Sequence, residues 1–242
     1  MSGFDLADPE RGVFAAAHQG SAAIVFDHDR VIASGPGAAI DAANLAERGS
    51  LELDGVALEV EMSALEGPLR LAGELTGEVE LTLCQAIGAM RREGEETEIA
   101  CLAVSERSGV EPSGEVELRR AIAIAFADGA LLGLRAARPV GAAGHGEEEI
   151  VVALSDSEEP APFSQALLST EYDEQGRHRR ANLELWRDGE GPLRVAGTIV
   201  CGAAVEVGDR WVETAFFRWS LNGRPGLGRY EIVRAAGSPQ QS

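Results

Sequence analysis

An eight-residue phrase occurs twice in this chain of 242 residues, and it constrains the fold more than any other feature. The copy at residues 66–73 reads EGPLRLAG, and the copy at residues 190–197 reads EGPLRVAG. Each copy lies between two alternating, strand-like runs, so its Gly-Pro pair stands at a turn, where the fixed φ and missing N–H of proline do no harm. The phrase predicts two similar supersecondary units.

A second, weaker echo follows each copy in the same order. Residues 98–105 (EIACLAVS) align with residues 213–220 (ETAFFRWS). The alternative explanation is chance similarity in a chain rich in Ala, Gly, Glu and Arg. Between the two units, residues 111–114 (EPSG) read as a linker. The sequence therefore predicts an N-terminal β unit at 1–112 and a C-terminal β unit at 113–242.

Turn signals recur at short spacing along the chain, and alternating or wholly apolar runs separate them. Asp54-Gly55, Asp128-Gly129 and Asn222-Gly223 are typical hairpin turns. Only Ala38 to Arg48 has helical character, since it is rich in alanine and is followed by Gly49. The predicted fold is all-β: two related antiparallel barrels or half-barrels with one short helix.

Charge and composition exclude several classes of function. The formal charge of -19 repels phosphate backbones and anionic lipid heads, so neither nucleic acid nor a membrane is an expected partner. All basic residues are arginine, which excludes Schiff-base and P-loop lysine chemistry. Three cysteines, Cys84, Cys101 and Cys201, lie in apolar runs without CxxC spacing. Buried reduced thiols and a cytoplasmic location are the expectation.

No catalytic signature of high specificity is present, so chemistry must be sought in local clusters. The densest polar cluster contains Asp27, His28 and Asp29. On a strand His28 faces away from its two neighbours, so the three cannot form one metal site unaided; no metal and no cofactor are expected. Asp27 and His28 are candidate catalytic residues, a carboxylate-histidine pair at a cavity mouth. The alternative is a polar hairpin turn.

Glu213 is the other candidate catalytic residue. On a strand it shares one face with Trp211, Ala215, Phe217 and Trp219. Desolvation among aromatic side chains raises the pKa of a carboxyl group and keeps a proton available for an alkene or a carbonyl. The alternative is an ion pair with an arginine on a neighbouring strand, such as Arg194 or Arg229. Glu231 is likewise a candidate partner of Arg224 or Arg218.

Aromatic residues concentrate in the second half of the chain, which contains nine of the twelve. That half is the better place for an apolar ligand cavity, although the aromatic side chains could equally fill a larger core. The candidate ligand-binding residues are Trp186, Trp211, Phe217, Trp219 and Tyr230.

The closing segment, residues 218–231 (RWSLNGRPGLGRYE), resembles the last motif of the AttH-like and carotenoid-hydratase-like lipocalin (calycin) superfamily. There a strand is followed by a (D/N)GR-x-G-x-G-x-x-E turn. The run from Tyr172 to Gly197 is also similar to that superfamily, so the resemblance covers mainly the C-terminal half. It implies a pair of lipocalin-like barrels enclosing an apolar site. The matching residues are Asn222, Gly223, Arg224, Gly226, Gly228 and Glu231, none with a catalytic role implied.

These observations lead to two hypotheses from different classes. The first is a protein that binds a small apolar or isoprenoid-like molecule in a barrel cavity and catalyses metal-free, acid-assisted hydration, cyclisation or isomerisation. The second is a non-catalytic structural or partner-binding β module, because folding alone explains both the repeat and the closing turn. A homodimer is open in either case. A pocket that contains Glu213, or Asp27 and His28, would favour the first hypothesis.

Overall fold

The computed structural model describes residues 2–19, 21–37, 48–109, 115–143, 145–155, 163–174, 176–189 and 191–235. This part of the chain is built from β-strands and one 3-10 helix, η3 (His145–Glu147). None of its helices is long and apolar enough to cross a membrane. The strands are β1 (Ser2–Asp8), β2 (Val13–His18), β3 (Ala22–Asp27), β4 (Arg30–Pro36), β5 (Arg48–Leu53), β6 (Val56–Ala64), β7 (Leu69–Gly73), β8 (Gly77–Arg92), β9 (Glu95–Ser108), β10 (Val116–Phe126), β11 (Leu131–Pro139), β12 (Glu149–Leu154), β13 (Gln165–Tyr172), β14 (His178–Trp186), β15 (Leu193–Val207), β16 (Arg210–Leu221) and β17 (Arg224–Ala235).

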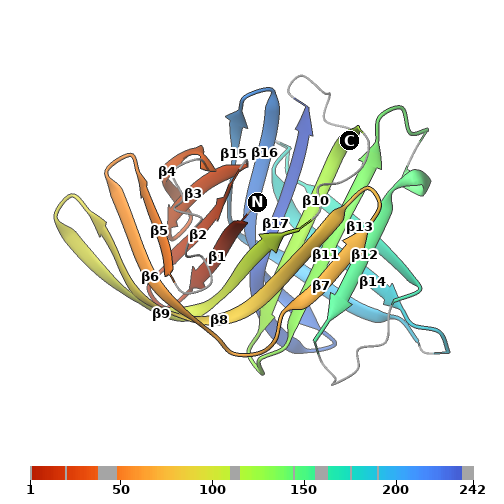
Figure 1. Cartoon of the computed structure of the whole chain (residues 1–242), viewed down its shortest axis with the longest axis horizontal. Coiled ribbons are helices and arrows are strands. Elements are labelled where there is room, and N and C mark those ends of the chain that lie inside the picture. The colour runs from red at the N-terminus through yellow and green to blue at the C-terminus, as the bar shows by residue number, and fades with distance from the viewer. Residues whose placement is uncertain are drawn as a thin grey trace.

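The strands form two antiparallel sheets, as the sequence predicts (Figure 1). The first sheet has nine strands in the order β4-β3-β2-β1-β9-β8-β6-β5, with β7 also paired to β8, and curls into a half-barrel. The second has eight strands in the order β12-β11-β10-β17-β16-β15-β14-β13. Its end strands β12 and β13 come into contact, so it makes a nearly closed barrel, called the second barrel below. The lipocalin-like, all-β prediction is confirmed.

Three sequence predictions have other outcomes. The expected helix lies outside the described residues except for Arg48, which begins β5, and the expected linker at 111–114 also lies outside them. The two copies of the repeated phrase occupy different places: β7 pairs only forward with β8, whereas β15 pairs with both β14 and β16. The phrase is therefore a shared turn-and-strand segment at two unlike positions, and the division at residue 112 stays a prediction.

The closing motif builds the β16–β17 hairpin. Asn222 and Gly223 both have positive φ, 48° and 91°, which is the turn geometry that matches the twist of a two-residue hairpin. A Cβ at Gly228 would overlap the carbonyl oxygen of Ala123, so glycine there lets β17 lie close against β10. At Gly226 a Cβ would stand 2.8 Å from the ring of Phe126. The motif is explained by chain packing.

Two apolar clusters hold the sheets together. In one, Leu71 and Leu81 of the first sheet pack with Ala123 and Leu131 of the second barrel. In the other, Phe14 and Phe26 of β2 and β3 pack against Phe216 of β16, with the Phe14 and Phe216 ring centroids 5.5 Å apart. The three cysteines are buried and unpaired, as expected. The contact between the sheets thus buries apolar side chains from both of them.

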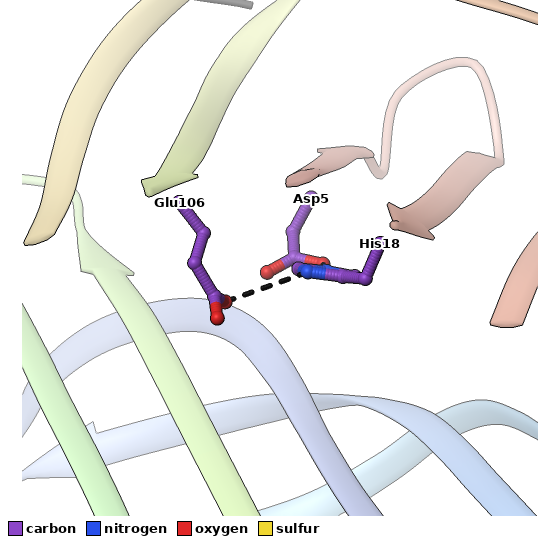
Figure 2. Close-up of side chains that lie close together, drawn as sticks. All are labelled: Asp5, His18 and Glu106. Atoms are coloured by element: carbon purple, nitrogen blue, oxygen red, sulfur yellow. Dashed lines mark hydrogen bonds and ion pairs between the residues drawn. The ribbon is translucent and has the colours of Figure 1, made fainter. Parts of the chain in front are cut away.

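A layer of buried charges also crosses this contact. Arg229 of β17, which is 1% exposed, places Nε 2.7 Å from Asp5 Oδ1, Nη2 3.0 Å from Glu106 Oε2 and Nη1 3.0 Å from Glu231 Oε2. Asp5 and Glu106 belong to β1 and β9 of the first sheet, so one guanidinium group binds carboxylates from both sheets. Figure 2 shows that His18 of β2 joins them, with Nε2 2.7 Å from Asp5 and Nδ1 3.5 Å from Glu106.

Burial by itself would raise the pKa of both carboxyl groups at this contact. For Asp5 the charges of Arg229 and His18 outweigh burial and hold the pKa below its usual range. For Glu106 the charges of Arg135, His18 and Arg229 do the same, and Arg135 Nη2 lies 2.6 Å from its Oε2. Both carboxyl groups are therefore ionised in the folded protein at neutral pH.

Replacing Arg229 by methionine is expected to lower the free energy of unfolding by about 3 to 5 kcal/mol, because buried carboxylates lose their partner. Denaturation in urea at neutral pH measures the change. The control is Arg218→Met, which removes an exposed arginine from β16 and should change stability little.

The difference in free energy of unfolding between the wild type and R229M should become smaller at acid pH. Carboxyl groups with a lowered folded pKa stabilise the protein above their unfolded pKa, about 3.9 for Asp and 4.3 for Glu, and the stability is lost as pH falls through the folded pKa. If the difference in free energy of unfolding stayed constant down to pH about 3, the ion pairs of Arg229 with Asp5 and Glu106 would be contradicted.

Candidate functional site

The interior of the second barrel is apolar along most of its length. Inward-facing residues alternate along each strand, and on β16 they are Ala215, Phe217, Trp219 and Leu221, all at most 3% exposed. Glu213 continues this inward face, as the alternation in the sequence predicts, and is 6% exposed. One carboxyl group therefore stands at the polar end of an aromatic core.

Glu213 has contacts with two other strands. Its Oε1 accepts a hydrogen bond from the main-chain N–H of His178, the first residue of β14, at 3.3 Å. The same oxygen lies 3.4 Å from His178 Nδ1. Its Oε2 accepts a hydrogen bond from Arg234 Nη2 of β17 at 3.3 Å. Glu213 therefore forms the ion pair with an arginine of a neighbouring strand that was the alternative interpretation of the sequence, and the partner is Arg234. The two arginines named as examples were wrong, because Arg194 pairs with Glu184 and Arg229 lies on the outer face of β17.

The pKa values of Glu213 and His178 move in opposite directions, and burial is the main cause of both shifts. Burial raises the pKa of Glu213, and the hydrogen bond from His178 and the charge of Arg234 only partly offset it. Burial lowers the pKa of His178 to about 3, and the charges of Arg234 and Arg120 add to the shift. The imidazole is therefore uncharged at neutral pH, beside a carboxyl group that holds its proton more tightly than a free one.

Aromatic rings hold His178 in place. The imidazole stacks on Tyr230 with the ring centroids 4.7 Å apart and the planes 13° from parallel, and the rings of Tyr172 and Phe217 lie 5.6 and 6.1 Å away. The Tyr230 hydroxyl is 2.8 Å from Thr170 Oγ1, which fixes the phenol ring in turn. The position of the imidazole is thus set by packing against these rings, and the hydrogen bond between Thr170 and Tyr230 holds the ring on which it stacks.

A cavity of about 530 Å³ opens beside these groups. It exists because β15 has small residues at this level: Gly202 pairs with Ala215, and Ala204 pairs with Glu213. Small side chains on the facing strand leave room that larger ones would fill. The residues lining the cavity include Asp29, Asp173, Arg177, His178, Ile199, Cys201, Gly202, Ala204, Trp211, Glu213 and Ala215.

The other predicted site residues have different places. Asp27 and His28 pair with each other at 2.8 Å on an exposed turn, and neither lines the cavity; their neighbour Asp29 does. Trp211 lines the cavity. Trp186 faces out of the barrel, because its strand neighbour Leu185 faces in.

The three remaining aromatic residues named from the sequence lie in the core beside the cavity. Phe217, Trp219 and Tyr230 are buried, and all three belong to the apolar cluster that fills the second barrel. Trp219 donates a hydrogen bond from Nε1 to the carbonyl oxygen of Gly228 at 3.3 Å. Phe217 and Tyr230 pack against His178, and Trp219 packs against Phe217. None of the three lines the cavity.

Sequence reasoning missed His178 and Arg234. His178 stands in a polar stretch, HRR, before the alternating run 181–186, and alternation alone would place it on the outer face with Arg180. A register shift reverses this: Glu171 pairs with Arg180, but Tyr172 pairs with His178, so Arg179 is an extra residue and His178 turns inward. No local signal in the sequence marks such a bulge.

Asp5, His18 and Glu106 have the residue types and the closeness of a metal site. One ligand atom from each lies within 4.8 Å of the others. However, Asp5 Oδ1 is bound by Arg229, and Glu106 Oε2 is bound by both Arg229 and Arg135. A cation would have to displace guanidinium groups that carry the same sign of charge. These residues therefore fit a structural ion network better than a metal centre.

Three solved structures share the fold over nearly the whole chain. A protein from Nitrosomonas europaea assigned to AttH aligns with a TM-score of 0.59 and 12% identity, over 96% of this chain and 90% of its own. Kievitone hydratase from Nectria haematococca aligns with a TM-score of 0.65 and 10% identity, over 98% and 88%. CghA aligns with a TM-score of 0.51 and 10% identity, over 96% and 73%. No family profile and no curated protein sequence matches the chain.

The raised pKa of Glu213 has a measurable effect on stability. A carboxyl group with a raised folded pKa contributes most below its unfolded pKa of about 4.3, and the contribution is lost as pH rises through the folded value. Glutamine does not titrate. The stability of the wild type relative to Glu213→Gln should therefore fall as the pH rises above the unfolded pKa of about 4.3.

Urea denaturation of the wild type and of Glu213→Gln at a series of pH values measures this trend. The titration of Asp5 and Glu106 contributes equally to both proteins, so it cancels in the difference between their free energies of unfolding. The control is Glu184→Gln on β14, whose side chain is 41% exposed and pairs with Arg194. A pH trend equal to that of the control would show that Glu213 has no raised pKa.

Proposed function

We propose that this chain, which has the fold of AttH-like lipocalin proteins, binds a small apolar molecule in the second barrel and protonates it through Glu213. The single observation that carries the proposal is the cavity of about 530 Å³ that borders a buried carboxyl group of raised pKa. A general acid needs this combination of a retained proton and access to substrate.

The surroundings of Glu213 fit acid chemistry on an apolar molecule. Trp211, Ile199 and Ala215 offer an apolar wall, and small residues of β15 leave the space beside the carboxyl group. Arg234 at 3.3 Å stabilises the carboxylate that remains after proton transfer. The reaction types that this site suits are hydration, cyclisation and isomerisation of an unsaturated compound. Among these, hydration agrees with the name of one structural neighbour.

Binding can be measured through Trp211, whose ring borders the cavity. Tryptophan fluorescence titrations with farnesol, oleic acid and chalcone sample terpenoid, fatty-acid and polyketide shapes. At least one probe should bind with a dissociation constant below millimolar, and Trp211→Phe should remove most of the signal. If none of the probes binds, the second barrel is a structural or partner-binding module.

Glu213→Gln should separate binding from catalysis. The amide keeps the shape and costs less to bury than a carboxylate, so probe binding should stay within about tenfold, or about 1.4 kcal/mol. Hydration of a bound alkene, detected by mass spectrometry as the gain of one water, should be lost. A protein that binds probes but never hydrates them, with or without Glu213, would be a ligand carrier.

Blocking the cavity tests the site without touching the carboxyl group. Ala204 is exposed at the rim and pairs across the strands with Glu213, so Ala204→Phe places a ring over the opening. Probe affinity should fall by about tenfold or more, or about 1.4 kcal/mol. The matched control is Ala196→Phe, at an exposed position of the same strand. Equal binding by the two variants would place the ligand elsewhere.

A further inference from the structure

Part of the main-chain edge of β15 has no partner strand where it borders the cavity. β14 pairs with β15 only as far as Arg180, which lies opposite Thr198. β14 begins two residues earlier, at His178, whose main-chain N–H binds the carboxyl group of Glu213 and not β15. Among the described residues, the part of β15 after Thr198 is therefore paired on one side only, with β16.

The hairpin turns at the two ends of β16 show which main-chain groups of β15 lie on its free side. Val207 and Arg210 flank a two-residue turn, and such a flanking pair exchanges both main-chain hydrogen bonds. Pairs of this kind alternate along an antiparallel ladder, so the N–H of Ala203 points toward β16, and those of Gly202 and Ala204 point away from it. The two-residue turn between β16 and β17 leads to the same assignment. In the described part of the chain, no main-chain hydrogen bond reaches Gly202 from the free side.

Gly202 lies where this free edge meets the candidate acid. It is half-buried, it lines the cavity, and it has no side chain to cover its N–H. β15 stands between β16 and β14 in the sheet, and Glu213 of β16 reaches the N–H of His178 on β14, so the Glu213 side chain extends across β15. Its carboxyl group and the free N–H of Gly202 thus both lie on the β14 side of β15. A main-chain N–H fixed in a strand is a preorganised donor that needs an acceptor.

The groups around this donor indicate which ligand oxygen fits. The N–H of Gly202 can only donate, and a carbonyl oxygen can only accept, without bringing a charge. A ligand carboxylate would meet Asp29 and Asp173, since Arg177 is the one arginine among the described residues that line the cavity. The carbonyl oxygen of Gly202 points the same way but toward the exposed rim at Ala204, where water can reach it. An uncharged carbonyl group therefore suits the free edge best.

We propose that the ligand of the second barrel is an unsaturated apolar compound with a carbonyl group, and that the main-chain N–H of Gly202 holds its carbonyl oxygen. The inference rests on the proposed function and names the substrate class of that site. It places the polar end of the ligand at the free edge of β15, beside Glu213, and leaves Trp211 and Ile199 to contact the apolar part.

Farnesal and farnesene test this hydrogen bond. They share a terpenoid skeleton, and only farnesal has a carbonyl group; the protein has no lysine side chain that could bind the aldehyde as a Schiff base. Replacing Gly202 by glycolic acid turns its N–H into an ester oxygen without adding bulk. The affinity for farnesal, measured by tryptophan fluorescence, should fall about fivefold, and the affinity for farnesene should stay within about twofold of the wild type.

The matched control replaces Ala203 by lactic acid. The N–H of Ala203 points toward β16, so its loss should lower the stability in urea and leave the ratio of the farnesal and farnesene affinities as in the wild type. An unchanged ratio in the glycolic acid variant would overturn the proposal. An equal fall of the ratio in both variants would overturn it as well.

Infrared spectra of the wild type give a second readout that needs no variant. The stretching band of the ¹³C-labelled carbonyl group of bound farnesal should lie at lower frequency than in hexane, as it does for any hydrogen-bonded carbonyl. A bound band at the hexane frequency would remove the carbonyl contact but leave the proposed function in place, provided that farnesene binds. If neither probe binds the wild type, the proposed function and this inference both fail.

Discussion

The ion contact between Arg229 and the carboxylates of Asp5, Glu106 and Glu231 is the interaction on which the rest of the structure depends. A guanidinium group that is 1% exposed is stable only when its charge is matched, and two of its three carboxylates come from the first sheet. The two sheets must therefore lie against each other for either set of charges to be satisfied. The apolar clusters on either side supply the packing, and the ions determine how the sheets are aligned.

Strand β17 connects this contact to the candidate site, because its side chains alternate between the two faces of the second barrel. Arg229 and Glu231 face the first sheet. Tyr230, between them, faces the interior and stacks on His178, and Arg234 reaches Glu213 from the same inner face. A shift of β17 by one residue would turn its outward-facing side chains inward and its inward-facing side chains outward. The register that docks the two sheets is therefore also the register that builds the site. Glycine at 228, where a side chain would strike β10, helps to hold that register.

The candidate site combines a buried carboxyl group with a buried, uncharged imidazole. Both Glu213 and His178 lose solvation in the second barrel, and desolvation favours the uncharged form of each. This pairing differs from the ion network only a strand face away, where arginines keep the carboxyl groups ionised. Carboxyl groups thus have pKa values shifted in opposite directions at the contact between the sheets and inside the second barrel, because nearby positive charges outweigh burial at Asp5 and Glu106 but only partly offset it at Glu213.

The sequence by itself determined the strand-rich fold, the hairpin at Asn222-Gly223 and the inward position of Glu213, because turn chemistry and period-two alternation are local properties of the chain. Tertiary structure decided the rest. The bulge at Arg179 that turns His178 inward, the choice of Arg234 over Arg194 or Arg229 as partner, and the unlike places of the repeated phrase all depend on strand pairing between distant segments. Pairing register and cross-sheet contact are set by the whole core, and no short stretch of sequence records them.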